Sequence, residues 1–233
     1  MIIYSVPKPM VEPWKTLQEK SIKSWGPHKV LLFGNEPWAD LSVEVNSEGT
    51  PLLSSILESI SKTSPSRLVM LINTDIILTD SFHKTVNLLV SDQGHRDLFL
   101  IGRRTDLPDM KLHSSSGIDY FIFNTGFLHF NGIPPFTYGR TAWDNWLVWY
   151  TKSQGCFLVD ITREATVYHQ AHDYSHSKGD AWTGLEAIEN QLLAGKHLLT
   201  IDDTDYILKG EWLIPNLNKY FRRLKSVSKK LTS

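Results

Sequence analysis

A polar tripeptide directly follows a fully apolar stretch of the chain. Leu68 to Ile72 is uninterrupted by polar residues, and Asn73-Thr74-Asp75 comes immediately after it. A carboxylate at the end of a buried strand lies in the crevice where α/β folds bind ligands, and its oxygens suit a hard divalent cation. Asn and Asp also begin turns after strands, so a metal site and a plain turn are alternatives here. Asp80, five residues further on, is either a second ligand or a helix cap.

A second group of possible ligands lies near residue 170. It contains three imidazoles and one carboxylate, from His169, His172, Asp173 and His176. Imidazole is a common metal ligand, and a carboxylate beside it can orient the ring. No Glu stands between His172 and His176 to act as the general base of the helical His-Glu-x-x-His zinc motif. The group indicates either a metal site or histidines that hydrogen-bond a loop.

A third carboxylate lies among tryptophans. Asp144 follows Trp143 and precedes Trp146 by two residues, near the start of a helix predicted over 141–150. In the first helical turn, its charge gains about 0.3–1 kcal/mol from the helix dipole. In a site, it would take a proton from a hydroxyl while the indole rings pack on a sugar face. For the rings themselves, the spacing favours core packing.

Basic residues follow two of the predicted strands. Lys8 comes soon after the strand at 2–6, and Arg103 and Arg104 follow the strand at 97–101. The guanidinium fork matches the oxygens of a phosphate. These side chains would therefore neutralise a diphosphate bound at the strand ends, and the alternative is that they are ordinary surface cations.

Strands and helices alternate along the chain and would position these side chains. The apolar runs predict strands at 2–6, 29–33, 68–72, 97–101, 120–123, 156–159 and 165–168, and helices at 11–25, 52–60, 81–90, 141–150 and 184–193. Continuous apolar strands are typical of a parallel sheet that is covered on both faces. The pattern predicts a three-layer, Rossmann-like α/β fold with a mostly parallel central sheet and site loops at the carboxyl ends of the strands.

Composition restricts the class of protein. The 233 residues include 24 Lys and Arg against 25 Asp and Glu, which lacks the basic excess of nucleic-acid-binding domains. Cys156 is the single cysteine, so an internal disulfide and a cysteine-based zinc site are excluded. The start of the chain has no signal-peptide pattern, and no segment is apolar enough to span a membrane, so we expect a cytoplasmic protein.

The expected organisation is one domain over residues 1–215 and a basic tail over 216–233. The tail carries Lys and Arg without acidic residues and is predicted to form a partly frayed amphipathic helix. Contact with an anionic membrane and a solvated helix face are its two interpretations.

Taken in order, these stretches resemble a group of GT-A-fold glycosyltransferases from bacteria, plants and large algal viruses. The resemblance runs from Ile2 to about His176. It is carried by Val-Pro-Lys-Pro at 6–9, Ser24-Trp25, Leu32-Phe33-Gly34, the stretch 72–78, Gly102-Arg103-Arg104, and the stretches 117–121, 139–146 and 169–176.

The resemblance implies a transferase that uses a nucleotide sugar. Asn73-Thr74-Asp75 takes the place of the Asp-x-Asp motif, which holds Mn²⁺ or Mg²⁺ against the diphosphate of a UDP- or GDP-sugar. Because Asn stands first, Asp75 would carry most of the metal contact, with His169 or His172 as an added ligand. Asp144 lies where inverting members place their base. The donor-binding residues implied are Pro7, Lys8, Asn73, Asp75, Arg103 and Arg104, and the acceptor would be a glycan or lipid-linked hydroxyl.

Two other functions are compatible with the same residues. One is a metal-dependent hydrolase built on His169, His172, Asp173 and His176. The other is a sugar- or nucleotide-binding module without catalysis, in which the tryptophans bind glycan and Asp75 is only a turn residue.

Overall fold

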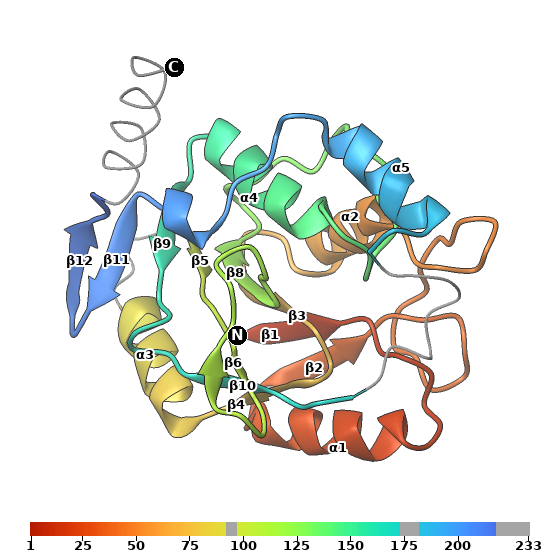
Figure 1. The fold of residues 1–233 in the computed structure, drawn as a ribbon, viewed down its shortest axis with the longest axis horizontal. Coiled ribbons are helices and arrows are strands. Elements are labelled where there is room, and N and C mark those ends of the chain that lie inside the picture. Colours follow the sequence, from red (N-terminus) through yellow and green to blue (C-terminus); the bar gives the residue numbers. More distant parts are fainter. Residues whose placement is uncertain (92–96, 173–181, 218–233) are drawn as a thin grey trace, which may run out of the picture.

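The computed structural model of the chain describes residues 1–91, 97–172 and 182–217 (Figure 1). Its helices are α1 (Trp14–Ser24), α2 (Leu53–Thr63), α3 (Asp80–Ser91), α4 (Trp143–Ser153) and α5 (Leu185–Ala194), with a 3-10 helix at Ile201–Asp203. Its strands are β1 (Ile2–Ser5), β2 (Lys29–Leu32), β3 (Leu68–Ile72), β4 (Ile76–Leu78), β5 (Leu98–Ile101), β6 (Thr105–Asp106), β7 (Lys111–Leu112), β8 (Tyr120–Asn124), β9 (Phe157–Asp160), β10 (Val167–His169), β11 (Tyr206–Lys209) and β12 (Trp212–Pro215).

The main sheet confirms the predicted class. Its eight strands lie in the order β12-β11-β9-β5-β8-β3-β1-β2. Neighbouring strands pair in parallel except where β8 lies between β3 and β5 and where β12 follows β11. The sheet is therefore mostly parallel, and the predicted strands and helices are found close to their expected positions.

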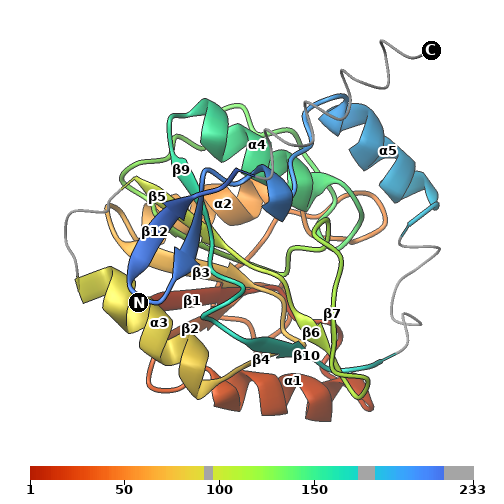
Figure 2. The ribbon, with the colours of Figure 1, turned by 60° about the vertical axis from the view of Figure 1, so that its left-hand side comes forward.

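Helices cover both faces of this sheet. Figure 1 shows α2 and α4 on one side and α1 and α3 on the other, and Figure 2 shows the same layers from a turned view. Alternate residues of β3 divide between two apolar cores: Val69 and Leu71 face the α2 and α4 side, while Met70 and Ile72 face the α1 and α3 side. Burial of each such side chain contributes about 1.5–3 kcal/mol to the stability of the fold. The apolar run from 68 to 72 is continuous because both of its faces are covered.

Strand direction decides which loops meet at one edge of the sheet. The carboxyl ends of β1, β3 and β5 point to the same edge because these strands are parallel in the sheet. β8 runs the opposite way, and its first residue, Tyr120, pairs with the last residue of β3, Ile72. The residue before β8, Asp119, therefore lies beside the residues that follow β3.

A second, four-stranded sheet brings residue 169 to the same edge. Its order is β4-β10-β6-β7, and His169 on β10 pairs with Ile76 on β4. The sequence analysis predicted a strand at 165–168 but not β4, β6 or β7, because strands of two or three residues carry too little periodicity to be recognised. The hairpin of β11 and β12 was also not predicted.

Two further expectations concern the end of the chain and the membrane. Most of the expected basic tail, residues 218–233, lies outside the described residues. Within the part of the chain that is described, none of the helices combines the length and the apolar character needed to cross a bilayer.

Candidate functional site

A cleft of about 840 Å³ opens at the edge where these loops meet. This volume lies within the usual range of small-molecule sites. Its lining includes most of the residues singled out from the sequence, namely Pro7, Lys8, Asn73, Asp75, Arg104, Asp144 and His169, together with Asp119. The polar side chains that follow β1 and β3 thus share one cavity with the first turn of α4.

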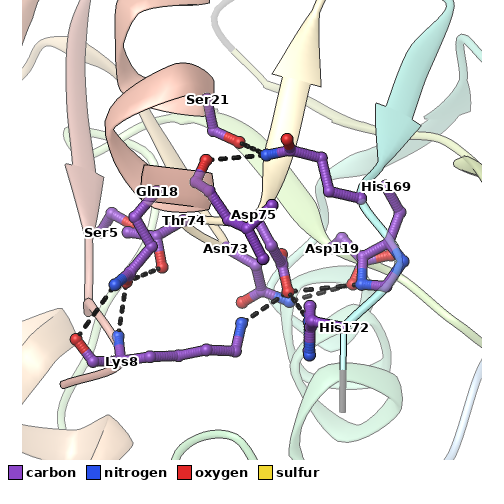
Figure 3. A network of polar contacts seen from close by, with 12 residues as sticks. Ser5, Lys8, Gln18, Ser21, Asn73, Thr74, Asp75, Asp119, His169 and His172 are labelled. Atoms are coloured by element: carbon purple, nitrogen blue, oxygen red, sulfur yellow. Dashed lines mark hydrogen bonds and ion pairs between the residues drawn. The ribbon is translucent and has the colours of Figure 1, made fainter. Parts of the chain in front are cut away.

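Asp75 is the centre of a buried polar cluster (Figure 3). Its Oδ2 atom lies 2.5 Å from Lys8 Nζ, 2.8 Å from His172 Nε2 and 3.3 Å from His169 Nε2. Burial alone would raise the pKa of Asp75, but the Lys8 ammonium and the hydrogen bonds from the two imidazoles hold that pKa well below its usual range. Asp75 is therefore a carboxylate at neutral pH, surrounded by groups that favour its charge.

Gln18 on α1 holds the two loops of this cluster together. Its side-chain oxygen accepts hydrogen bonds from the Lys8 backbone N–H at 2.7 Å and from the Thr74 hydroxyl at 2.8 Å. Its amide nitrogen donates to the Lys8 carbonyl at 3.3 Å. Gln18 is almost fully buried, so these bonds are protected from water. The sequence analysis missed this residue, because a Gln within an amphipathic helix carries no signal of its own.

The two histidines reach Asp75 from the end of β10 and from the residues that follow it. His169 is the last residue of β10, and its Nδ1 lies 3.5 Å from Asp106 Oδ1 on the far side of the ring. The Gln170 backbone N–H donates to the Asp75 carbonyl at 3.3 Å, which fixes this segment against the β3 loop. A carboxylate behind a histidine orients its ring and supports the other nitrogen as a metal ligand.

The cluster fits a divalent metal ion. Asp75, His169 and His172 each offer one ligand atom, and these atoms all lie within 4.8 Å of one another. Asp75 Oδ1 is buried and has no hydrogen-bond partner among the described residues, so one carboxylate oxygen has no partner to offset its desolvation. Two imidazoles and a carboxylate favour a transition metal ion over Mg²⁺, which prefers oxygen ligands.

Asn73, at the first position of the Asn-x-Asp pattern, is held by other protein groups. Its Nδ2 donates to Asp119 Oδ1 at 2.9 Å, and its Oδ1 accepts the Tyr138 hydroxyl at 3.0 Å. Its backbone N–H donates to the Asp119 carbonyl at 2.9 Å. The side chain is therefore used to tie the β3 loop to the start of β8, which is a positioning role within the cleft wall.

Arg104 and Asp119 form a buried ion pair beside this loop. The Arg104 Nη1 donates to both oxygens of Asp119, at 2.7 and 2.8 Å, and its Nε donates to Asp106 Oδ1 at 2.8 Å. Burial alone would lower the pKa of Arg104, and the two carboxylates raise it above its usual value instead. Asp119 was named in the sequence analysis only within the stretch 117–121 and without a role. A carboxylate directly before an apolar strand was the available signal.

Arg103 does not join the cleft. Its Nε donates to the His113 carbonyl at 2.5 Å, its backbone N–H donates to Thr162 Oγ1, and it is not among the residues that line the cavity. Neighbouring residues of an extended segment point to opposite sides, so only one of the two consecutive arginines faces the site. Of the two arginines expected at a bound diphosphate, Arg104 lines the cleft and Arg103 does not, and Arg104 is already paired with Asp119.

Asp144 lies on another wall of the cleft, in the first turn of α4. Burial is the main cause that raises the pKa of this partly buried carboxyl to about 7. The charge of Asp119 also raises the pKa, while hydrogen bonds from the backbone lower it. A carboxyl with a pKa near neutral pH is suited to accept and release protons. The geometry therefore permits general-base chemistry at this wall.

The backbone that presents Asp144 is held in an unfavourable conformation. Ala142 has φ 76°, in the left-handed region, which costs a residue with a Cβ about 1–2 kcal/mol. Buried Asn190 on α5 compensates by donating to the Thr137 and Thr141 carbonyls, at 2.9 and 3.1 Å. Strain that neighbouring elements hold in place is often found at functional sites.

The tryptophans of α4 pack in the core, as the spacing favoured. Trp143 and Trp146 are almost fully buried, and the ring centroids of Trp143 and Tyr138 lie 4.6 Å apart. Trp143 also contributes to the cleft lining, so it is part of the core and of the site wall.

The remaining candidates lie elsewhere. Asp80 is exposed at the start of α3 and does not belong to the ligand group, and the Phe82 backbone N–H is capped by the Thr79 hydroxyl at 3.3 Å instead. Neither reading of Asp80 from the sequence is therefore supported. Asp173 and His176 lie outside the described residues.

Comparison with known proteins gives a likeness of structure. No protein-family model and no curated protein matches the chain. Residues 1–349 of S. aureus TarS, solved in complex with UDP-GlcNAc, superpose with a TM-score of 0.56 and 13% identity over 83% of this chain. The match covers 65% of that chain, so this chain spans slightly less than two thirds of it.

A second solved structure gives a weaker match. A glycosyltransferase involved in the glycosylation of the major capsid of PBCV-1 superposes with a TM-score of 0.43 and 9% identity, over 82% of this chain and 98% of that chain. The likeness to TarS concerns the fold, and it confirms the GT-A, Rossmann-like class that the sequence predicted.

Proposed function

We propose that the chain is a metal-dependent glycosyltransferase that moves a sugar from a nucleoside-diphosphate sugar to a hydroxyl acceptor with inversion. The observation that carries this proposal is the pairing of two groups in one cleft. A cluster of possible cation ligands around Asp75 lies at the strand ends, and Asp144, whose carboxyl has a pKa of about 7, lies on another wall. The likeness to TarS, which was solved with UDP-GlcNAc, supports a nucleotide-sugar donor.

The leaving group sets the first requirement. Sugar transfer passes through an oxocarbenium-like state while negative charge develops on the departing diphosphate. A metal ion held by Asp75, His169 and His172 would supply positive charge to that diphosphate. Lys8 lines the same part of the cleft and adds a positive charge from the end of β1. The donor set favours Mn²⁺ over Mg²⁺.

The acceptor sets the second requirement. Inversion is a single displacement in which the acceptor oxygen attacks the anomeric carbon as the bond to the diphosphate breaks. The acceptor hydroxyl must lose its proton to a base, and we assign that proton to the Asp144 carboxylate. With a pKa of about 7, Asp144 is largely ionised just above neutral pH and returns the proton readily to water after the transfer.

The test is a panel of UDP- and GDP-sugars, screened for Mn²⁺-dependent release of the nucleoside diphosphate. Asp75→Ala should abolish turnover and metal-dependent donor binding, because it removes the carboxylate on which the cluster is built. Asp80→Ala is the matched control, since Asp80 is exposed and outside the cluster, and it should behave as the wild type. Unchanged turnover in Asp75→Ala would reject the proposal.

A second candidate function follows from the same donor set. Two imidazoles and one carboxylate also suit a catalytic zinc ion, so a zinc-dependent hydrolase uses the cluster equally well. Elemental analysis distinguishes the two enzymes: tightly held zinc and no nucleotide requirement would favour the hydrolase. Calorimetry with nucleotide sugars tests for a non-catalytic module, which would bind the donor without hydrolysis or transfer.

A further inference from the structure

We propose that the Lys8 ammonium is a built-in counter-ion of the Asp75 site, which leaves the carboxylate when a divalent cation binds and moves to the donor's diphosphate. The inference rests on the proposed function and extends it. It assigns to Lys8 a coupling of metal binding to nucleotide binding, in addition to the positive charge that it brings to the cleft.

The first observation is that Lys8 already holds the carboxylate that a metal ion would need. Lys8 Nζ contacts Asp75 Oδ2 at 2.5 Å, and the two side chains are 15% and 7% exposed. The same oxygen is approached by His172 and His169. A divalent cation on this carboxylate would come within a few ångströms of the ammonium, in a setting where like charges repel strongly. Metal binding therefore requires the ammonium to move away.

The second observation is that the Lys8 side chain can move while its backbone stays fixed. Gln18 binds both the N–H and the carbonyl of residue 8, and it also holds the hydroxyl of Thr74 beside Asp75 (Figure 3). The four-carbon stem of a lysine is flexible and carries its charge at the tip. The displacement is thus a change of side-chain rotamer in a rigid frame.

The third observation concerns the place to which the Lys8 ammonium moves. Lys8 lines the cleft, and Asp75 is the one partner of its ammonium among the described residues. If a metal ion took Asp75 alone, a partly buried ammonium would be left without a counter-charge, which is unfavourable. A diphosphate that enters with the metal supplies that counter-charge. Metal and nucleotide should therefore each strengthen the binding of the other, by the same factor.

The test measures Mn²⁺ binding by electron paramagnetic resonance, alone and with saturating UDP or GDP. Lys8→Met should bind Mn²⁺ alone at least tenfold more tightly than the wild type, because the competing charge is gone. The nucleotide should then raise the Mn²⁺ affinity of the variant by a smaller factor than that of the wild type. Lys15→Met is the control and should match the wild type, since the Lys15 side chain is half exposed and its ion pair within the described part of the chain is with Glu19, at 3.9 Å.

Lys8→Met binding Mn²⁺ alone no more tightly than the wild type would overturn the proposal. So would an unchanged coupling between Mn²⁺ and nucleotide. If Lys8→Met does not fold, Lys8→Gln makes the same test, because it keeps a hydrogen-bond donor toward Asp75 without the charge. A negative nucleotide-sugar panel with tighter Mn²⁺ binding in Lys8→Met would reject the transferase and retain the counter-ion. Active transfer in the wild type together with unchanged Mn²⁺ binding in Lys8→Met would retain the transferase and reject the counter-ion.

Discussion

Replacing Asp144 with Asn tests the assignment of the base through both stability and activity. Folding raises the pKa of this carboxyl from 3.8 to about 7, so the folded state favours the neutral form. Because folding raises the pKa, the stability that comes from holding Asp144 in its protonated form is complete below pH 3.8. That stability is lost as the pH rises through 7. At 1.36 kcal/mol for each pKa unit, an ionised Asp144 costs the fold at most about 4 kcal/mol above pH 7.

Asp144→Asn is neutral at every pH and removes this cost. Its side-chain oxygen can still accept the backbone hydrogen bonds that the carboxylate accepts in the wild type. We therefore expect the variant to gain stability over the wild type as the pH rises, by about 3 kcal/mol between pH 4.5 and pH 8. It should retain donor binding and lose transfer, because Asn has no basic oxygen for the acceptor proton.

The assay is urea unfolding of the wild type and the variant at pH 4.5 and pH 8, with a chelator present, together with transfer rates on the nucleotide-sugar substrate. The control is Asp109→Asn, because Asp109 is exposed and its replacement should give no pH-dependent difference. An Asp144→Asn gain that is equal at both pH values would refute the raised pKa. Transfer at the wild-type rate would exclude Asp144 as the base.

Two further substitutions probe the groups around Asp144. Asp119→Asn removes a like charge that raises the pKa of Asp144, so the midpoint of the plot of transfer rate against pH should move below about 7. An unmoved or higher midpoint would contradict this coupling between the two carboxyl groups. Arg104→Met leaves Asp119 buried without its cation and should reduce the free energy of unfolding by about 3–5 kcal/mol in urea titrations. Arg163→Met, at a side chain that is 66% exposed, should change it by less than about 0.5 kcal/mol, and equal losses in both variants would show that the buried pair adds nothing.

Local patterns in the sequence predicted much of the fold. The apolar run from 68 to 72 predicted a central strand because every side chain of a strand covered on both faces must be apolar. The rule that ligands bind at the carboxyl ends of parallel strands then directed attention to Lys8 and Asp75, and both line the cleft. Asp144 was singled out because it lies between tryptophans in the first turn of a predicted helix, and the structure has it in the first turn of α4.

The small sheet and the positioning residues were beyond such rules. Gln18 and Thr74 are 56 positions apart in the sequence, and Asn73 and Asp119 are 46 apart. Their hydrogen bonds exist only because α1 packs against β4, which follows the β3 loop, and because β8 pairs with β3. Neither periodicity within one segment nor the residue type alone reports a bond between segments.

The sequence by itself determined the layered α/β class and the carboxylates that could do chemistry, because both depend on residue types and spacing within single elements. Only the tertiary structure decided which of these side chains meet. It placed His169 and His172 on Asp75, turned Arg104 rather than Arg103 toward the cleft, and set Asp119 beside Asn73. The physical reason is that these contacts, and the pKa of Asp144 that burial raises, depend on strand order and direction across the whole sheet.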